Sequence, residues 1–498
     1  MADFVLAVKW LLVTLVIIGG VPLLVADYQF LLVAFHFRRL HYAKCRPFFP
    51  RTAILIPAWN EHAVIGASID RLMRLQYPLD RLRIYVVDDA STDATPQVIQ
   101  AKAAEYPGNV FHLRREKGGE GKAATLNHGL EIILSDDWMQ AILIMDADVI
   151  YEPDSLRKMS RHLADPRVGS VTAYIKEGSR PGNYMTRFIG YEYITAQAAA
   201  RRSQDVLGVI ACLAGGAQLH SRANLEAIGG RVDTSSLAED TVTTFRTQTA
   251  GRTVLFEPHA TVWAEEPGNI AGLWKQRLRW ERGNVQVTKM FSHVWFRHQP
   301  NNRLGSMSFG LLWFCLLLLP GFMILVSASL VTLWFIDSSL AWAAFHVLWL
   351  TNVITYVFIT SFALLIDPVI ARRVWFQALL FPGAVNVLIL LAAVIPTPLY
   401  WVSRQLLSAA GLTATTGWVH GIELITYIWV AACMGVAFLG KVAESRRFGK
   451  VLSPAFVYVG GYGPLLCAIT VAAYVKELRH AEQKWDKTEK TGKVAAPT

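Results

Sequence analysis

The chain has 498 residues, of which 53% are apolar and only 17% are charged. Together with a positive mean hydropathy, this composition excludes an ordinary soluble protein of this length and indicates a membrane protein. The net charge of +10 predicts no nucleic-acid partner, because anionic lipid headgroups or a phosphorylated substrate account for the excess. The five cysteines are scattered without a CxxC spacing, so the sequence indicates neither a zinc site nor a disulfide framework.

Apolar segments of membrane-spanning length lie at the start of the chain and throughout its last third. The first candidate span, residues 4–37, precedes a run of basic residues and is expected to be an uncleaved anchor. The positive-inside rule then puts the soluble region that follows in the cytoplasm. The further candidate spans are residues 306–335, 340–366, 374–395, 421–439 and 455–475.

Counting every candidate as a span conflicts with the basic tail that begins at Lys476, because this tail then falls outside the cell. We therefore expect one segment to be re-entrant or interfacial. The candidate breaks are the stretch "GGYGP" at residues 460–464 and the pair Pro396 and Pro398.

Short apolar runs alternate with helical patterns in the first half of the soluble region. The runs "TAILIPAWNE", "LRIYVVDDASTD", "NVFHLRRE" and "AILIMDADVI" predict strands, and helices are expected near residues 63–75, 96–105, 123–134 and 153–163. This alternation predicts an α/β domain with a doubly wound, mostly parallel sheet. In such sheets ligands bind beyond the carboxyl ends of the strands.

Three of these runs end in polar side chains. They are Asn60 and Glu61 after the first run, Asp88, Asp89 and Asp93 after the second, and Asp146 and Asp148 in the last. Any single aspartate is also explained as a cap of the following helix, and that alternative stays open. Two carboxylates at alternate positions after an apolar strand cost energy unless a cation or hydrogen bonds offset their charge. Oxygen ligands of this kind suit Mg²⁺ or Mn²⁺, and Mg²⁺ usually keeps waters and bridges substrate phosphates.

The glycine-rich stretch "KGGEGKAATLN" admits three interpretations. A phosphate-binding P-loop is excluded, because its first glycine is missing and Lys122 is followed by Ala123. A dinucleotide fingerprint is matched only nominally, by Gly119-x-Gly121-x-x-Ala124. The remaining interpretation is a flexible loop that presents Lys122 to a phosphate or a sugar.

Glu239 and Asp240 stand at the expected start of a helix that a strand follows. Capping of that helix is one explanation of both carboxylates. The other makes Asp240 a general base beside an acceptor hydroxyl. Position alone does not separate the two.

The stretch "KQRLRWERGN" raises a similar alternative just ahead of the apolar segments. A helix over residues 272–290 puts Gln276, Arg279 and Trp280 on one face, while Arg277 points elsewhere. Spacing alone leaves open whether this face is functional or belongs to a membrane-surface helix with an aromatic anchor. The residues assigned to the membrane surface in either case are Lys275, Arg277 and Arg282.

Six short motifs occur in a fixed order ahead of the later apolar segments: "PAWNE", "VVDDASTD", "GKAATLN", "DAD", "AED" and "QRLRW". In this order they resemble the membrane-integrated, inverting family-2 glycosyltransferases, such as the bacterial cellulose, hyaluronan, chitin-oligosaccharide and poly-N-acetylglucosamine synthases. The resemblance covers residues 50–290 closely and the flanking spans only in layout. The stretch "KWDKTEK" also resembles the tail of these enzymes, which implies a cytoplasmic C-terminus.

The resemblance implies a GT-A-like fold and a role for each matching residue. Asp240 would deprotonate the acceptor hydroxyl, while Gln276 and Arg279 would face the diphosphate and Trp280 would stack under the acceptor sugar. The metal ligands would be Asp146 and Asp148, which would hold the pyrophosphate through Mg²⁺ or Mn²⁺. The implied substrate-binding residues are Pro57, Asn60, Glu61, Asp88, Asp89, Lys122, Asp146, Gly215, Gly216 and Glu239.

Two departures from the family pattern concern this set. The acidic motif reads Ala238-Glu239-Asp240, without the threonine of the cellulose synthases. The acceptor-side loop reads "CLAGGAQLHSR" and matches only in its glycines, Gly215 and Gly216.

The implied domains are an N-terminal transmembrane anchor (residues 1–40), a cytoplasmic glycosyltransferase domain (41–271), interfacial helices with the QxxRW motif (272–304), a transmembrane helical bundle (305–476) and a cytoplasmic or disordered tail (477–498). The implied enzyme is a multi-pass hexosyltransferase of the inner cell membrane. It would extend a β-linked polysaccharide from a UDP-sugar, UDP-N-acetylglucosamine or UDP-glucose, and translocate the product through its own helices. Accessory export or synthase subunits count among the implied partners.

Two alternative functions stay open, and only the second belongs to a different functional class. One is a lipid glycosyltransferase of the same fold that transfers a single sugar, as the ceramide glucosyltransferases do with a similar motif set. The other is a transporter or channel with a cytoplasmic regulatory domain, against which the near absence of ionisable residues in the later spans argues.

Overall fold

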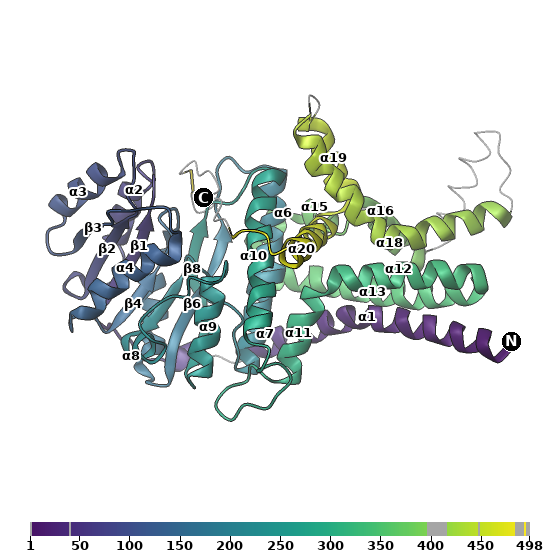
Figure 1. The fold of residues 1–498 in the computed structure, drawn as a ribbon, viewed down its shortest axis with the longest axis horizontal. Helices are drawn as coiled ribbons and strands as arrows, with labels where there is room; N and C mark the ends of the chain where they lie inside the picture. Colours follow the sequence, from purple (N-terminus) through teal and green to yellow (C-terminus); the bar gives the residue numbers. More distant parts are fainter. Residues whose placement is uncertain (1, 39–40, 396–415, 447–448, 484–492, 495–498) are drawn as a thin grey trace. The chain divides into compact units, whose positions relative to one another are not determined.

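The computed structural model describes residues 2–38, 41–395, 416–446, 449–483 and 493–494 (Figure 1). The chain divides into two compact units, each assembled from distant stretches of sequence. The helical unit comprises Met1–Phe30, Asn269–Glu281 and Leu311–His480. The sheet unit comprises Leu31–Gly268, Arg282–Gly310 and Ala481–Thr498.

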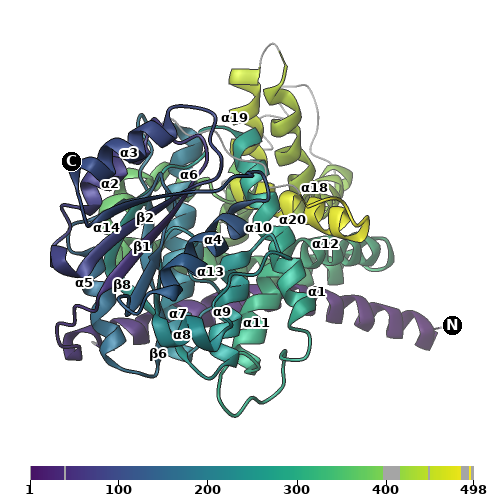
Figure 2. The same cartoon turned by 60° about the vertical axis from the view of Figure 1, so that its left-hand side comes forward.

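The sheet unit is built around one eight-stranded sheet with the order β3-β2-β1-β4-β7-β6-β8-β5 (Figure 2). The strands are β1 Thr52–Ala58, β2 Leu82–Asp88, β3 Val110–Arg114, β4 Ala141–Ile144, β5 Ile150–Tyr151, β6 Val168–Glu177, β7 Gln218–Ser221 and β8 Thr253–Ala264. Strands β3, β2, β1 and β4 run parallel, and so do β6 and β8. Antiparallel pairs join β4 to β7, β7 to β6 and β8 to β5. The prediction of a mostly parallel α/β sheet is confirmed.

Helices cover both faces of the parallel half of this sheet. Strand β1 is buried on both sides, as its continuous apolar run predicts, with only Pro57 partly exposed. Leu126 and Leu130 of helix α4 pack on one face against Leu55 and its neighbours, while α2 and α3 lie on the other face (Figures 1 and 2). The helices of the sheet unit are α2 Ile65–Leu72, α3 Thr95–Glu105, α4 Lys122–Ser135, α5 Ser155–Ser160, α6 Tyr184–Glu192, α7 Ala199–Leu207, α8 Arg222–Ala227 and α9 Glu239–Thr249.

Gly129 sets how closely α4 approaches the sheet. A Cβ atom at this position would lie 2.5 Å from Leu55 Cδ1 and 2.8 Å from Val87 Cγ2. These separations are shorter than any normal van der Waals contact, so only glycine allows the observed packing. Helix α4 begins at Lys122, so the close packing of this helix on the sheet also fixes the position of the Lys122 backbone.

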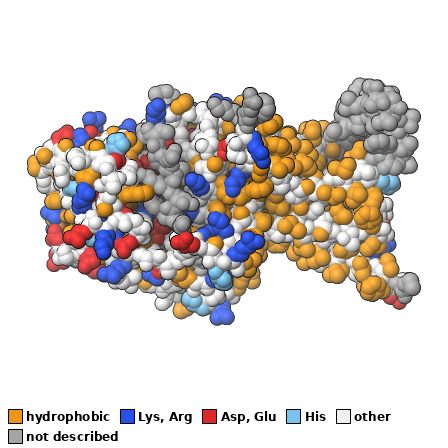
Figure 3. Space-filling model, turned by 45° about the horizontal axis from the view of Figure 1, so that its top comes forward, with side chains coloured by type: hydrophobic (Ala, Val, Ile, Leu, Met, Phe, Trp, Pro, Cys, Tyr) orange, Lys and Arg blue, Asp and Glu red, His pale blue; other side chains and the backbone are white. Residues whose placement is uncertain are grey.

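The helical unit consists of long apolar helices with several short ones between them. The helices wholly within this unit are α12 Leu319–Ile336, α13 Ser338–Ile366, α14 Pro368–Arg373, α15 Trp375–Leu379, α16 Ala384–Val394, α18 Thr416–Glu444, α19 Gly449–Gly460 and α20 Tyr462–Leu478. Three more, α1 Ala2–Arg38, α10 Ile270–Met290 and α11 Met307–Leu317, belong to it in part. Among the described residues, four helices are long and apolar enough to cross a membrane: Ala2–Arg38, Leu319–Ile336, Ser338–Ile366 and His420–Glu444. On the face drawn in Figure 3, apolar side chains gather over this unit, whereas charged side chains gather over the sheet unit.

Three of the candidate spans differ from their predicted form. Residues 374–395 do not form one long helix, because Pro382 and Gly383 separate the short helix α15 from α16. Residues 306–335 divide into α11 and α12 at Leu318. The second helix begins directly after it, with Leu319 and Pro320. Residues 455–475 are bent by 94° between α19 and α20. This bend confirms the break predicted at "GGYGP"; the alternative break at Pro396 and Pro398 lies outside the described residues.

Candidate active site

The turns that follow β1 and β2 are joined by hydrogen bonds between their polar residues. The backbone N–H of Asn60 donates to Ser91 Oγ at 3.0 Å, and Asn60 Oδ1 accepts from the backbone N–H of Thr92 at 2.9 Å. The N–H of Glu61 donates to Thr95 Oγ1 at 2.8 Å, at the start of α3. Asn60 adopts a left-handed backbone with φ of 53°, which asparagine tolerates better than most residues. The two strand ends therefore form one rigid edge, as the parallel register predicts.

Asp88 and Asp89 are buried at the end of β2 and make contacts within this edge. Asp88 Oδ1 accepts from the N–H of Ser91 at 2.9 Å, and its Oδ2 lies 3.2 Å from a guanidinium nitrogen of Arg114. Asp89 accepts from Arg115 and, at 3.2 Å, from the N–H of Gly119 in the glycine-rich loop. The two carboxylates thus hold the loop and the end of β3 in place.

The partners Arg114 and Arg115 were not among the predicted site residues. Arg114 is the register partner of Asp88 across the β2–β3 pair. Because neighbouring parallel strands end at the same edge, the basic pair in "HLRRE" was the sequence signal that would have identified them.

Lys122, at the first position of α4, is the centre of the carboxylate cluster. Its Nζ lies 2.6 Å from Asp146 Oδ1, 3.5 Å from Glu239 Oε1 and 3.5 Å from the carbonyl oxygen of Gly215. Burial alone would lower the pKa of this ammonium, but Asp146, Glu239 and Asp240 raise it above its usual value. Lys122 is therefore a cation among the carboxylates. It interacts with residues as distant in the sequence as Asp240, 118 positions later (122 to 240).

The double glycine in "CLAGGAQLHSR" leaves room for this cluster. A Cβ atom at Gly215 would lie 3.2 Å from Asp240 Oδ2 and 3.3 Å from Lys122 Nζ. At Gly216 it would lie 2.9 Å from Val149 Cγ2 and 3.6 Å from Asp146 Oδ2. The hydroxyl of Tyr151, a residue that the sequence did not single out, donates to the carbonyl of Gly216 at 2.8 Å and anchors the loop.

Asp240 lies in the first turn of α9, with its carboxylate beside Gly215. The N-cap of this helix is Ala238, whose side chain makes no capping bond, so neither Glu239 nor Asp240 serves as the N-cap. Asp240 Oδ1 accepts from the N–H of Thr241 at 2.7 Å. This carboxylate therefore lies at the positive end of the helix dipole.

Asp146 and Asp148 follow β4 directly, and both are partly exposed. The structure contains, among its described residues, no group of three or more His, Cys, Asp or Glu side chains arranged to hold a metal ion. A two-carboxylate site is nevertheless what Mg²⁺ uses when substrate phosphates and water complete its shell. With its side chain 38% exposed, Asp146 can reach such a ligand. The donor atoms therefore fit a hard divalent cation.

Gln276, Arg279 and Trp280 lie on α10, in its part that belongs to the helical unit. The helix predicted over residues 272–290 is confirmed, but the orientation predicted for Arg277 is wrong. Its guanidinium donates to Gln276 Oε1 at 2.6 Å and lies 4.0 Å from the ring centroid of Trp280. The long arginine side chain reaches both the preceding residue, Gln276, and the residue one turn later, Trp280. The prediction from helical spacing considered only the direction of the Cα–Cβ bond.

Arg277 and Arg282 are also buried rather than spread on a membrane surface, with 3% and 5% of their surfaces exposed. Within the sheet unit, Arg282 donates to the carbonyls of Ala481 and Glu482 at 2.7 and 3.1 Å. Only Lys275 keeps the exposed position expected of all three basic residues.

The start of α10 is held by Glu444, the last residue of α18. Its two carboxylate oxygens accept from the backbone N–H groups of Ile270 at 2.9 Å and Ala271 at 2.7 Å. Nearby, the ammonium of Lys441 lies 3.8 Å from the ring centroid of Trp274. A carboxylate at a helix N-terminus satisfies donors that the helix itself leaves unpaired. This contact fixes the helix that carries Gln276, Arg279 and Trp280.

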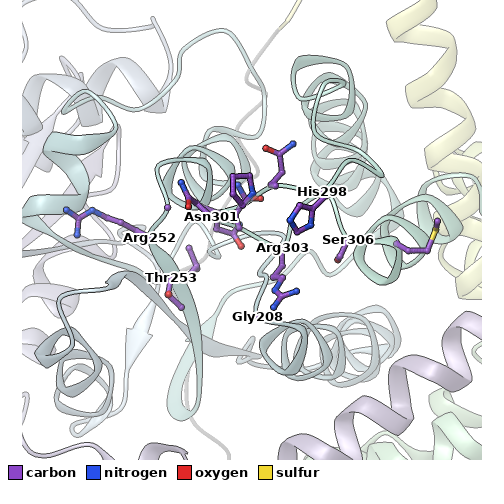
Figure 4. A pocket seen from close by; sticks show the side chains of 15 residues that line it. Gly208, Arg252, Thr253, His298, Asn301, Arg303 and Ser306 are labelled. Carbon is purple, nitrogen blue, oxygen red and sulfur yellow. The ribbon is translucent and has the colours of Figure 1, made fainter.

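A separate polar cavity of about 480 Å³ occurs in the sheet unit (Figure 4). Gly208, Arg252, Thr253, His298, Asn301, Arg303 and Ser306 are among its lining residues. None of the predicted site residues lines it, so it is distinct from the carboxylate cluster around Lys122.

Comparison with known proteins identifies the family. A family model described as "Glycosyltransferase like family 2" matches residues 50–283. The chain is 32% identical over 250 residues to the probable glycosyltransferase YdaM of Bacillus subtilis, covering 50% of this chain and 58% of that protein.

Two further relatives carry more specific names. The beta-monoglucosyldiacylglycerol synthase of Synechocystis sp. is 30% identical over 239 residues, covering 48% of each chain. The poly-beta-1,6-N-acetyl-D-glucosamine synthase of Staphylococcus aureus is 27% identical over 234 residues, covering 47% of this chain and 54% of that protein. The matched region thus spans about half the length of the curated relatives.

A solved structure supports the fold. The mannosyltransferase PcManGT from Pyrobaculum calidifontis, determined in complex with GDP-Man and Mn²⁺, aligns with a TM-score of 0.50 and 20% identity over 76% of this chain and 97% of that one. The sheet unit is GT-A-like, and the long apolar helices are compatible with a membrane-associated enzyme. Residues 50–283 therefore form a region of the glycosyltransferase-like family 2.

Proposed function

We propose that the protein is a membrane-bound, inverting glycosyltransferase that uses a UDP-sugar to extend a β-linked polysaccharide. The observation that carries this proposal is the convergence of Lys122, Asp146, Glu239 and Asp240 around the double glycine at the strand ends. Such a site combines a fixed cation, candidate metal ligands and one carboxylate available as a base. The transfer of a sugar from a nucleoside diphosphate donor needs these elements.

In the proposed reaction Asp240 accepts the proton of an acceptor hydroxyl, whose oxygen attacks the anomeric carbon of the donor. The bond from that carbon to the diphosphate oxygen breaks, and the sugar is transferred with inversion. Lys122 stabilises the negative charge that builds on the departing diphosphate. A Mg²⁺ or Mn²⁺ ion held by Asp146 and Asp148 would neutralise more of that charge when bound.

The donor pocket proposed for the nucleotide is the edge formed by Pro57, Asn60, Glu61, Asp88 and Asp89. Gln276 and Arg279 are proposed to face the diphosphate, with Trp280 under the acceptor sugar. Arg277 joins this set, because its contacts with Gln276 and Trp280 hold both side chains in fixed orientations. Gly215 and Gly216 are proposed to leave room for the acceptor.

The long apolar helices support a place in the inner cell membrane, with the sheet unit on the cytoplasmic side where UDP-sugars are made. We propose that the product leaves through these helices, with accessory export or synthase subunits as partners. UDP-N-acetylglucosamine and UDP-glucose are the proposed donors. The relatives support this choice, since one is named for poly-N-acetylglucosamine and another for a glucosyl lipid.

The second candidate is transfer of one sugar to a lipid. The 30% identity to a beta-monoglucosyldiacylglycerol synthase favours it, because this relative is no more distant than the polysaccharide synthase. The purified protein should be incubated in liposomes with radiolabelled UDP-sugars and Mn²⁺ or Mg²⁺. We expect a high-molecular-weight product that a linkage-specific glycosidase digests; UDP release with only a monoglycosylated lipid would support the second candidate and exclude the first.

A further inference from the structure

A cysteine, a histidine and a glutamate are aligned in the sheet unit, away from the carboxylate cluster around Lys122. Cys45 Sγ lies 3.5 Å from His162 Nδ1, and the opposite ring nitrogen, His162 Nε2, lies 2.8 Å from Glu257 Oε2. The three side chains come from the segment after the first apolar helix, from the short helix at Arg161–Ala164 and from β8. A nucleophile, a base and a group that orients the base form the arrangement used in nucleophilic catalysis.

Glu257 determines which nitrogen of His162 carries the proton. This carboxylate is completely buried and also accepts from Arg161 at 2.6 Å and from the N–H of His259 at 3.0 Å. Burial would raise the pKa of Glu257, but the bonds from His162 and Arg161 hold it at about 2. An ionised Glu257 requires a proton on His162 Nε2, so in the neutral ring Nδ1 is left as an acceptor that faces the thiol of Cys45.

A shared metal ion does not explain this cluster. The contacts of His162 leave from opposite edges of the ring, so Cys45 and Glu257 cannot bind one ion together with it. Nor is the thiol permanently ionised. Burial raises the pKa of Cys45, while Arg161 opposes this and Glu257 and Asp165 add to it. The sulfur becomes a nucleophile only as His162 takes its proton, which is how a histidine activates a serine.

The environment of Cys45 suits a small polar reagent. Cys45 is half-buried, so water-sized molecules reach it more easily than bulky ones. The Nε atom of neighbouring Arg161 is buried and has no hydrogen-bond acceptor among the described residues. A buried donor without a partner is costly, and an oxygen of a bound reagent would satisfy it.

We propose that Cys45 is an oxidation site that reacts with hydroperoxides, with His162 as its base and Glu257 as the residue that positions His162. The thiol proton moves to His162 Nδ1, and the sulfur attacks one peroxide oxygen. The sulfur–oxygen bond forms as the oxygen–oxygen bond breaks. The leaving hydroxide or alkoxide takes the proton back from His162, so that thiol and hydroperoxide become sulfenic acid and water or alcohol.

The test uses the purified full-length protein and hydrogen peroxide as the probe, with sulfenic acid trapped by dimedone and located by peptide mass spectrometry. We expect Cys45 to be labelled at least about tenfold faster than free N-acetylcysteine in the same solution. His162→Gln and Glu257→Gln should each slow labelling about tenfold or more, whereas the control His62→Gln, at an exposed histidine, should leave it unchanged.

The comparison with N-acetylcysteine needs no variant, so it decides the question even if His162→Gln or Glu257→Gln fails to fold. Labelling of native Cys45 no faster than that of N-acetylcysteine would overturn the proposal. So would unchanged labelling in a correctly folded His162→Gln protein. Either result would leave His162, Arg161 and Glu257 as a purely structural ion-pair network. The outcome is independent of the proposed glycosyl transfer.

Discussion

The ammonium of Lys122 lies 2.6 Å from the carboxylate of Asp146, the residue proposed to bind the divalent cation. A cation bound there would compete with this ammonium for the same oxygen atoms. Lys122 would therefore lower the affinity for metal until a donor diphosphate supplies further ligands and further negative charge. This relationship predicts that the metal binds together with the nucleotide sugar and not before it.

Replacing Lys122 tests that competition. We expect Lys122→Gln to raise the affinity for Mn²⁺ in the absence of nucleotide by about tenfold, on the order of 1.4 kcal/mol, while sugar transfer falls. Electron paramagnetic resonance of free Mn²⁺ measures the binding directly. Lys102→Gln is the matched control, because Lys102 also pairs with two carboxylates, Asp70 and Glu105. Unchanged Mn²⁺ affinity in Lys122→Gln would contradict the competition.

Gly215 offers a test of the crowded centre of the site. In Gly215→Ala the new methyl group would lie 3.2 Å from Asp240 Oδ2 and 3.3 Å from Lys122 Nζ, so one of these groups must shift. We expect the rate of transfer to fall roughly tenfold, about 1.4 kcal/mol in the barrier, with thermal stability little changed. Gly321→Ala is the control, since a Cβ there meets no atom within 4 Å. Equal rates in the two variants would show that this spacing does not matter.

Glu444 is predicted to position the helix of the QxxRW motif. Glu444→Ala leaves the N–H groups of Ile270 and Ala271 without their carboxylate, at a cost of about 1 kcal/mol. We expect faster hydrogen exchange in the first turn of α10 and a roughly fivefold lower kcat, with little change in KM for the donor. Glu423→Gln, at a residue paired with His420 on the same helix α18, is the control. Normal exchange and normal kcat in Glu444→Ala would exclude this positioning role.

Glu177, at the end of β6, predicts a pH dependence of stability. Burial raises the pKa of this carboxyl to about 7, and the nearby Glu266 adds to the rise. Because the folded-state pKa lies above the unfolded one, the stabilisation is present in acid and is lost as the pH rises from about 4.5 to about 7. We expect a lower thermal midpoint at pH 8 than at pH 5, and a smaller difference in Glu177→Gln. The same difference in both proteins would contradict this assignment.

The sequence predicted the local features of this protein better than its long-range contacts. The parallel strands, the turn acids at Asp88 and Asp146 and the helix at 272–290 all follow from short apolar periods and residue type. Contacts between distant segments do not follow from them. Glu444 caps helix α10, which begins 174 residues earlier, and neither segment contains a sequence pattern that predicts this contact.

Side-chain reach accounts for the remaining error at the site. Helical spacing assigned Arg277 to another face than Gln276 and Trp280, although its side chain contacts both. The guanidinium reaches both partners because the arginine side chain is long and flexible. The kink between α19 and α20 was predictable, in contrast, because glycine and proline mark it in the sequence.

The measurement that tests the central claim most directly compares the wild-type protein with Asp240→Asn across a panel of UDP-sugars with Mn²⁺. We expect the wild type to transfer sugar from at least one donor and Asp240→Asn to be slower by ~10²–10⁴, while both bind UDP alike. Asp137→Asn, at a fully exposed aspartate, should match the wild type. Equal transfer by wild type and Asp240→Asn, or no transfer by the folded wild type from any UDP-sugar, would contradict the account.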